Sequence, residues 1–194
     1  MKLYYHPDAC SLASQIALRE AGRPFEVEDV DLTSKRTETG ADFTAINPKG
    51  YVPALRLDNG ELLTENLAVL DYIAAENPAL GLQGPLGRSR LLETLAYISS
   101  ELHKSFTPLF VSSTWPEKAE ARFLIIKRMR YLADRMKGDY LLGDHPTVAD
   151  FYLLVMLRWA EKVEVDVPAK LVALRTRLEA RPAVQDALRT ETPV

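Results

Sequence analysis

Residues 47–55 read NPKGYVPAL and place Pro53 at the start of a short apolar strand candidate. A proline lacks the backbone N–H that a strand uses for pairing, so Pro53 belongs at the first residue or at the edge of a strand. A cis Val52-Pro53 bond would turn the backbone N–H and C=O of Val52 outward, as an edge for an extended ligand. X-Pro bonds are more often trans, so the meaning of this stretch depends on the elements around it.

The segment that follows Pro53 predicts a hairpin and then a helix. Residues 52–64, VPALRLDNGELLT, place Asn59-Gly60, a pair favoured in tight turns, between two apolar segments. Residues 65–76, ENLAVLDYIAAE, carry apolar side chains at helical spacing. The expected order is therefore strand, strand, helix.

A strand-helix-strand unit is expected before Pro53. Residues 2–5, KLYY, predict a short strand, and a helix is expected from about residue 11 to residue 21, closed by Gly22 and Pro24. Residues 25–32, FEVEDVDL, alternate apolar and acidic side chains, as a strand does. A unit of this length implies a parallel pair of strands with a right-handed crossover.

The chain beyond residue 76 has a different pattern. Residues 77–86 form a linker that is dense in glycine and proline, and the helical runs that follow are expected near residues 88–110, 117–137, 169–180 and 183–189, with another beginning at residue 147. Thr147 can cap that last helix and Asp150 favours its first turn, in the spacing of a capping box. We expect an α/β domain over residues 1–76 and an all-α domain over residues 87–194.

Composition excludes several classes of protein. The chain of 194 residues is 47% hydrophobic and 26% charged, with a net charge of −3, and no basic surface for nucleic acid is indicated. No apolar run approaches the roughly 20 residues that cross a bilayer, and the N-terminal residues lack the apolar region of a secretory signal. One unpaired cysteine fits a reducing compartment, so a cytoplasmic location is expected.

That single cysteine lies in residues 6–14, HPDACSLAS, where a strand gives way to a helix. The unpaired N–H groups and the positive end of the dipole at a helix start favour the thiolate, which would lower the pKa of Cys10 below its usual value of about 8.5. A lone cysteine is also commonly a small buried hydrophobic residue. This stretch alone leaves both interpretations open.

Six stretches, taken in order, resemble the glutathione S-transferase family, and more specifically its bacterial beta class. They are MKLYY-P-ACSLAS at the start, VDL-SKRT (residues 30–37), NPKGYVPAL, LTENLAVLDYI (63–73), SSELHKSFTPLF (99–110) and LLGDHPTVADFYLL (141–154). The resemblance covers nearly the whole chain. It implies a thioredoxin-like domain of order βαβ-ββα with a cis-proline, followed by a C-terminal helical bundle.

The resemblance implies that glutathione lies extended across the first domain. The Val52 backbone, before Pro53, would pair with the cysteinyl unit, while Glu65 and Asn66 would hold the γ-glutamyl end at a helix N-terminus that favours a carboxylate. Lys35 would reach the glycine carboxylate. Without the resemblance, Glu65 is an acid at a helix start and Lys35 a solvated loop lysine. Two further residues complete the implied glutathione site: Tyr51 and Ser100.

The same resemblance implies the catalytic groups. Cys10 matches the cysteine of the beta class that faces the glutathione sulfur, with the hydroxyl of Ser11 beside it at the helix start. His103 matches a histidine on the opposite wall, where it would supply a hydrogen bond or a charge. Ala96 departs from the family, because relatives often carry an Asn there that contacts glutathione. Tyr5 is expected to pack in its strand.

The implied reaction is attack of the glutathione thiolate on a small hydrophobic electrophile, with glutathione as co-substrate and no metal. The electrophile pocket would be lined by variable aromatic residues: Phe106, Phe110 and Trp115. Thiol–disulfide exchange through Cys10 is an implied second activity, since glutathione can supply the resolving thiol. The alternatives are a glutathione-dependent dehalogenase or thioltransferase, and a non-catalytic binding protein for hydrophobic ligands.

The resemblance also implies a homodimer, with one subunit's first domain against its partner's helical domain. Residues 1–76 hold 7 Lys and Arg against 13 Asp and Glu, which leaves 24 − 7 = 17 against 27 − 13 = 14 in the rest of the chain. This opposite excess of charge supports such an arrangement. Neither a nucleic acid nor a membrane is expected as a partner.

Overall fold

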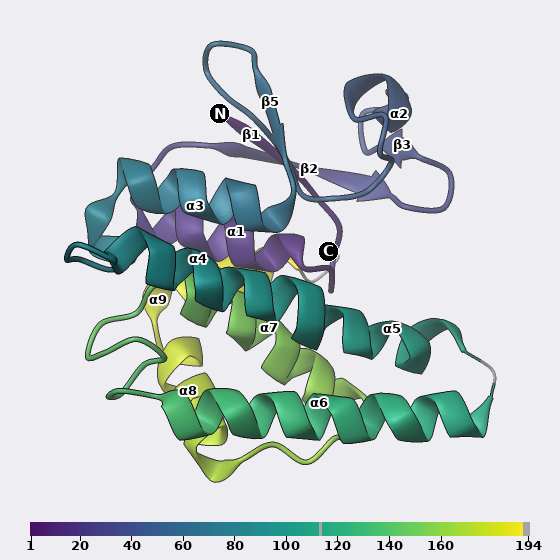
Figure 1. Ribbon diagram of the computed structural model, residues 1–194. Helices are drawn as coiled ribbons and strands as arrows, with labels where there is room; N and C mark the ends of the chain where they lie inside the picture. The colour runs from purple at the N-terminus through teal and green to yellow at the C-terminus, as the bar shows by residue number, and fades with distance from the viewer. Residues whose placement is uncertain (113, 192–194) are drawn as a thin grey trace.

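The computed structural model describes residues 1–112 and 114–191, and Figure 1 shows a small sheet with its helices above a layer of longer helices. The first part contains β1 (Lys2–Tyr5), α1 (Ser11–Glu20), β2 (Glu26–Asp31), β3 (Arg36–Thr37), α2 (Phe43–Ile46), β4 (Ala54–Arg56), β5 (Leu62–Thr64) and α3 (Asn66–Glu76). The second part contains η1 (Pro78–Leu80), α4 (Gly87–Tyr97), η2 (Ile98–His103), α5 (Lys104–Val111), α6 (Trp115–Arg135), α7 (Val148–Lys162), α8 (Ala169–Glu179) and α9 (Pro182–Thr190). Residues 113 and 192–194 of the predicted helical domain lie outside the described residues.

The sheet confirms the predicted fold class. Its strand order is β3-β2-β1-β4-β5, with β1 parallel to β2 and antiparallel to β4. The predicted hairpin pairs β4 with β5, with Leu55 opposite Leu63. Two short elements that were not predicted, β3 and α2, lie between the βαβ unit and the hairpin.

The two faces of the sheet are covered differently because successive side chains of a strand point to opposite faces. Leu3 and Tyr5 of β1 join the main core with α1 and α3, whereas Tyr4, between them, packs with Phe43 of α2 in a small second core. The main core continues from the sheet through α1 and α3 into α7 (Figure 1). The sheet with its helices and the layer of longer helices thus share one core, and the residues of the predicted site are divided between these two layers.

The start of α7 is a capping box, as predicted. The carboxylate of Asp150 accepts hydrogen bonds from the Thr147 N–H at 2.8 Å and the Thr147 hydroxyl at 2.9 Å. It also accepts one from the N–H of Leu141 at 2.8 Å, which ties the preceding loop to the helix. Asp150 is fully buried, so these three donors satisfy a carboxylate that water does not reach.

The helix predicted over residues 88–110 is divided. A π-helical turn, η2, separates α4 from α5, so the run is not one regular helix. The buried stripe nevertheless continues through the turn at Leu95, Ile98 and Leu102. Within residues 1–112 and 114–191, no helix is both long and apolar enough to span a membrane.

Candidate functional site

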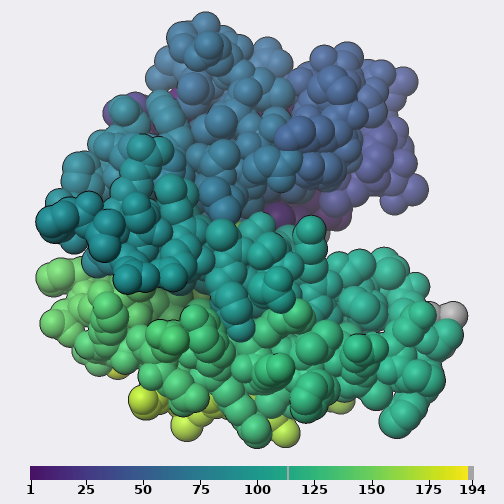
Figure 2. Space-filling model, viewed as in Figure 1, coloured from purple at the N-terminus to yellow at the C-terminus, as the bar shows by residue number. Residues whose placement is uncertain are grey.

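Cys10 lies at the junction of β1 and α1, beside the strand that begins after Pro53. It is half-buried, and its Sγ is 3.9 Å from the backbone oxygen of Val52, toward which the thiol can donate. The Val52-Pro53 bond is cis. In Figure 2 the surface is hollowed at the right, between the purple and blue atoms of the N-terminal part and the teal-green atoms of the helical part.

The charge state of Cys10 differs from the one expected for a thiol at a helix start. Burial raises its pKa to about 12, and the nearby negative charge of Glu65 adds to that effect. Of the two interpretations that the sequence left open, the raised pKa favours the buried neutral thiol, because desolvation outweighs the helix N-terminus. At neutral pH Cys10 is a neutral thiol and a hydrogen-bond donor.

The charged residues predicted to hold the ends of glutathione contact the segment that precedes Val52. Glu65 Oε1 accepts a hydrogen bond from the hydroxyl of Tyr51 at 2.6 Å and pairs with the ammonium of Lys49. These two partners lower the pKa of the Glu65 carboxyl, so it is ionised at neutral pH. Lys35 donates from Nζ to the backbone oxygen of Gly50 at 2.8 Å. Lys49 was not predicted to contact Glu65, although it lies within the NPKGYVPAL stretch.

Asn66 and Ser11 have positions that correct their predicted roles. The amide oxygen of Asn66 accepts from the Ser14 hydroxyl at 2.7 Å, and its nitrogen donates to the Cys10 backbone oxygen at 3.2 Å. The buried side chain of Asn66 thus links the starts of α3 and α1 by hydrogen bonds, and its oxygen already accepts one from Ser14. Ser11 is fully buried, and its hydroxyl hydrogen-bonds to the backbone N–H and C=O of His6 instead of facing the site.

His103, at the end of η2, is half-buried on the helical side of the site. Its Nδ1 is 2.7 Å from the hydroxyl of Tyr152, and its ring packs edge-on against Trp159 with centroids 4.9 Å apart. Burial lowers the pKa of His103 to about 4, and the neighbouring charge of Lys104 lowers it further. The imidazole is neutral at pH 7, so the predicted supply of charge from His103 is wrong and only a hydrogen bond remains.

The predicted electrophile residues differ in their accessibility. Phe106 is fully buried and packs against Trp159, so it supports the wall without lining it. Phe110 is 48% exposed and rests edge-on against the same Trp159 ring, which makes these two rings the accessible aromatic surface. Trp115, at 79% exposure, has no ring contact among the described residues. Ser100, which was predicted to bind glutathione, uses its hydroxyl to donate a hydrogen bond to the backbone oxygen of Ala96 in the preceding helical turn.

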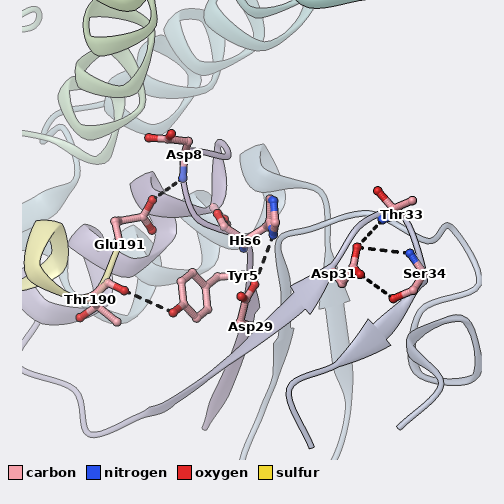
Figure 3. Close-up of polar contacts among 10 residues, drawn as sticks. Tyr5, His6, Asp8, Asp29, Asp31, Thr33, Ser34, Thr190 and Glu191 are labelled. Carbon is pink, nitrogen blue, oxygen red and sulfur yellow. Dashed lines mark hydrogen bonds and ion pairs between the residues drawn. The ribbon is translucent and has the colours of Figure 1, made fainter. Parts of the chain in front are cut away.

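The loop before Cys10 is held by the C-terminal end of the described chain. Figure 3 shows Glu191 accepting a hydrogen bond from the Asp8 N–H, at 2.7 Å, and Tyr5 donating to the Thr190 backbone oxygen at 3.4 Å. Trp159 donates from Nε1 to the Asp8 backbone oxygen at 2.8 Å. This loop therefore connects the cysteine to the aromatic wall.

No cluster of three or more His, Cys, Asp or Glu side chains suited to a metal is found among the described residues.

Comparison with known proteins gives consistent results along the chain. The family description "Glutathione S-transferase, N-terminal domain" matches residues 9–76, and "Glutathione S-transferase, C-terminal domain" matches residues 82–189. Glutathione S-transferase GstA of Escherichia coli O157:H7 is 45% identical over 198 residues, which cover 98% of each chain. Glutathione S-transferase GST-4.5 of Xanthomonas campestris pv. campestris is 37% identical, again over 98% of each chain.

Solved structures give the same result at the level of the fold. A ternary complex of BphK, a bacterial glutathione S-transferase, superimposes with a TM-score of 0.93 at 46% identity, covering 98% of this chain and 99% of that one. A sphingomonad glutathione S-transferase in complex with glutathione gives 0.91 at 45% identity, over 98% of each chain. A beta-class enzyme of Sphingomonas chungbukensis gives 0.92 at 44% identity, over the full length of both.

Proposed function

This chain belongs to the glutathione S-transferase family and transfers groups to glutathione, and we propose which of its residues bind glutathione and support its thiolate. The observation that carries the proposal is the 3.9 Å separation of the Cys10 sulfur from the Val52 backbone oxygen, with Lys35 bonded to Gly50 and Glu65 bonded to Tyr51 in the same segment. A tripeptide paired with the Val52 backbone would bring its own sulfur close to Cys10. Its charged ends would meet charges of opposite sign.

Each end of glutathione has a matching group. The carboxylate of Glu65 would pair with the α-amino group, and the backbone N–H groups that open α3 would receive the α-carboxylate. Lys35 would take the glycine carboxylate in place of the Gly50 backbone oxygen that it now contacts. Tyr51 and Lys49 hold Glu65 in place, and Lys49 has to share this carboxylate with the incoming amino group.

The reaction needs glutathione as a thiolate, and neutral donors would stabilise it. Cys10 is a thiol at neutral pH and can donate S–H to the glutathione sulfur without adding a second negative charge. The neutral imidazole of His103 can donate from the ring nitrogen that Tyr152 does not contact. The N–H groups at the start of α1 contribute the dipole of that helix. Stabilisation of the thiolate by hydrogen bonds lowers the pKa of the bound thiol.

The second substrate would be a small hydrophobic electrophile that packs on Phe110 and Trp159. These rings are accessible on the helical wall, and Trp159 also contacts His103, so an apolar group there would lie next to the thiolate. Trp115 stands at the start of α6 and is open enough to take part. Aryl halides, epoxides and chlorinated metabolites are all compatible with such a surface.

Thiol–disulfide exchange through Cys10 is a second candidate activity. The position of the Cys10 sulfur favours it, because the glutathione sulfur would lie within reach of a mixed disulfide. The raised pKa of Cys10 acts against it, since the thiolate is the attacking form and is scarce at neutral pH. Conjugation is therefore the main reaction, and exchange would gain importance only at alkaline pH.

Isothermal titration with glutathione tests the assigned site. Glu65→Ala should weaken binding at least tenfold, about 1.4 kcal/mol, because it removes the partner of the α-amino group. Arg36→Ala is the matched control, since this exposed side chain donates a hydrogen bond to the Gly40 backbone oxygen and has no proposed contact with glutathione. The absence of heat with wild-type protein at millimolar glutathione would overturn the site. A panel of electrophiles assayed with glutathione then separates a conjugating enzyme from a binding protein, which shows no turnover.

Three further features of the protein are part of the proposal. The two domains would comprise residues 1–76 and 87–194, joined by residues 77–86, in line with family matches that end at residue 76 and resume at residue 82. The molecule would form a homodimer. Its single cysteine, kept as a thiol by burial and by the site, supports a location in the reducing cytoplasm.

A further inference from the structure

The hydroxyl of Tyr152 lies where four structural elements meet. Tyr152 is in the second turn of α7 and is 1% exposed, and its hydroxyl is 2.7 Å from Nδ1 of His103 in η2. Burial raises the pKa of this phenol, an ionised Cys10 would raise it further, and hydrogen bonding from Ser99 and Asn66 acts in the opposite direction. The hydroxyl is thus close to groups of α1, α3 and η2, on the boundary between the two parts of the molecule.

The donors around this hydroxyl determine the direction of its hydrogen bonds. The nitrogen of Asn66 donates to the Cys10 backbone oxygen and has a second N–H, and Ser99 has a hydroxyl proton, so both can donate to the Tyr152 oxygen. The phenol keeps its proton, because its pKa is raised. Among the described residues, Nδ1 of His103 is the partner that lies at hydrogen-bond distance from this hydroxyl, at 2.7 Å, so we assign the phenol proton to that bond.

The hydrogen bond to Nδ1 fixes the tautomer of His103. A neutral imidazole carries one proton, and a nitrogen that accepts a hydrogen bond cannot hold it. With the pKa of His103 near 4, the ring is neutral at the pH of the reaction, and its proton is then on Nε2. Nε2 has no hydrogen-bond partner within residues 1–112 and 114–191 and is free to donate to a ligand.

We propose that Tyr152 is a positioning residue of the transferase reaction, which holds His103 in the Nε2-protonated tautomer and so keeps a donor directed at the glutathione sulfur. The inference rests on the role of His103 in the proposed function. Tyr152 touches neither the substrate nor the sulfur, and acts only through the ring. Asn66 donates to the Cys10 backbone oxygen and lies close enough to this hydroxyl to influence the pKa of Tyr152, so it stands between the two proposed donors of the thiolate.

Tyr152→Phe is the direct test, because it removes one buried oxygen and keeps the ring that packs in the core. Without the phenol, Nδ1 loses its donor, the proton can move to Nδ1 and the Nε2 donor is lost in part of the molecules. We expect kcat to fall about tenfold, the size of one hydrogen bond to an anion. The thiol pKa of bound glutathione, followed by thiolate absorbance, should rise, while KM for glutathione stays within about twofold. Tyr131→Phe, which removes an exposed phenol of α6, is the control and should change none of these quantities.

Nitrogen NMR of the imidazole separates positioning from a loss of structure. The wild-type protein should show His103 protonated at Nε2, and Tyr152→Phe should show a mixture of tautomers. A wild-type spectrum with the proton on Nδ1 overturns the inference, even where the variant does not fold. The double variant Tyr152→Phe/His103→Ala should be no slower than His103→Ala alone, since Tyr152 acts through His103.

The controls distinguish failure of this inference from failure of the proposed function. If His103→Ala leaves kcat and the thiol pKa unchanged, the assigned role of His103 is wrong, and the positioning role of Tyr152 falls with it. If His103→Ala lowers kcat while Tyr152→Phe leaves kcat, the thiol pKa and the tautomer unchanged, only the inference about Tyr152 is overturned. A lower kcat and a raised thiol pKa in both single variants support both.

Discussion

At Cys10 two electrostatic effects oppose each other, and their sizes decide the outcome. A charge at a helix terminus is typically stabilised by about 0.3–1 kcal/mol, which is less than one pKa unit. Removal from water shifts a pKa by up to about 3–5 units for a fully buried group, so partial burial is enough to exceed the effect of a helix terminus. Burial therefore raises the pKa of Cys10 to about 12, in line with its proposed role as a neutral thiol.

Replacing Cys10 by serine tests this role. A hydroxyl keeps a donor of similar reach, so conjugation in Cys10→Ser should survive within roughly tenfold, about 1.4 kcal/mol in the barrier. Thiol–disulfide exchange should vanish in the same variant, because a hydroxyl cannot form a mixed disulfide. Both reactions can be measured on one preparation, with mass spectrometry of the oxidised wild type to detect the glutathione adduct.

The matched variant is His103→Ala, which should lower conjugation and retain exchange. A folded Cys10→Ser protein that loses conjugation by several orders of magnitude would show that the cysteine is essential to the chemistry. That result would contradict its assignment as a replaceable donor.

The residues of the site were predictable from sequence to different degrees. The proposed roles of Glu65, Lys35 and Val52 follow from the motifs that contain them. Asn66 could be located from sequence, but not the direction of its side chain, because that depends on Ser14 in the neighbouring helix. Tyr152 gave no sequence signal, since a tyrosine within an apolar helical run is ordinarily a core residue. Its contact with His103 joins residues 49 positions apart.

Among the elements, the start of α7 was fully predictable, because its capping box is local in sequence. Asp150 satisfies the N–H groups of Leu141 and Thr147 as well as the Thr147 hydroxyl. By contrast, η2 and the short β3 and α2 were not predictable, since π-helical turns and two-residue strands have no periodicity of their own. Tertiary packing determines them.

Removing the Asp150 carboxylate should destabilise the whole molecule, because α7 runs through the core. Asp150→Ala leaves two buried N–H groups without partners, at about 1–3 kcal/mol each, so we expect a loss of about 2–5 kcal/mol in the free energy of unfolding. Urea denaturation followed by circular dichroism measures it. Asp134→Ala, at an exposed position of α6, is the control and should stay within about 0.5 kcal/mol. An equal effect of the two substitutions would refute the structural role of Asp150.

The end of α9 gives the molecule a pH-dependent contact. Glu191 is half-buried and its Oε2 accepts from the Asp8 N–H, while its Oε1 is buried with no partner among the described residues. Burial raises the pKa of Glu191 to about 7; the charges of Asp8 and Asp29 add to this, and Arg158 opposes it. A raised pKa means that the folded protein favours the protonated acid. This contribution to stability is present below about pH 4.5 and is lost as the pH rises through about 7.

Glu191→Gln should remove that dependence while keeping an acceptor for Asp8. The melting temperature of the variant minus that of the wild type should increase from pH 5 to about pH 8, because glutamine stays neutral where Glu191 ionises. Differential scanning fluorimetry across this range measures the difference. Glu120→Gln, at an exposed position of α6, controls for the change in net charge. A constant difference between Glu191→Gln and wild type would contradict the raised pKa.

At the scale of the whole molecule, the site depends on a core shared by both parts. Of the proposed site residues, Cys10, Val52 and Glu65 lie in the N-terminal part and His103 lies in the helical part. Helix α7 packs against α1 and carries both Tyr152 and Trp159, so it connects the two walls. The arrangement follows from two domain patterns that are visible in the sequence, whereas the contacts between them require the folded chain.

Two features of the monomer fit the proposed homodimer. Several large apolar side chains are exposed: Tyr51, Leu86, Phe110, Val111, Trp115, Phe123, Tyr131 and Val172. Residues 1–76 carry a net charge of 7 − 13 = −6 and the rest of the chain carries 17 − 14 = +3, so the first part of one copy attracts the second part of another. A two-fold arrangement uses this attraction twice.

We therefore expect a homodimer whose dissociation responds to salt. Light scattering at micromolar concentration should give twice the chain mass of 21.8 kDa, and analytical ultracentrifugation should show weaker association as the salt concentration rises. The apolar contribution does not weaken with salt, so dimers should persist at high protein concentration even in about 1 M salt, where the Debye length falls to roughly 3 Å. A mass of one chain at micromolar concentration and low salt would refute the dimer. Association that is indifferent to salt would instead show that apolar contacts alone hold the two copies together, and that the opposite charges of the two parts do not face each other.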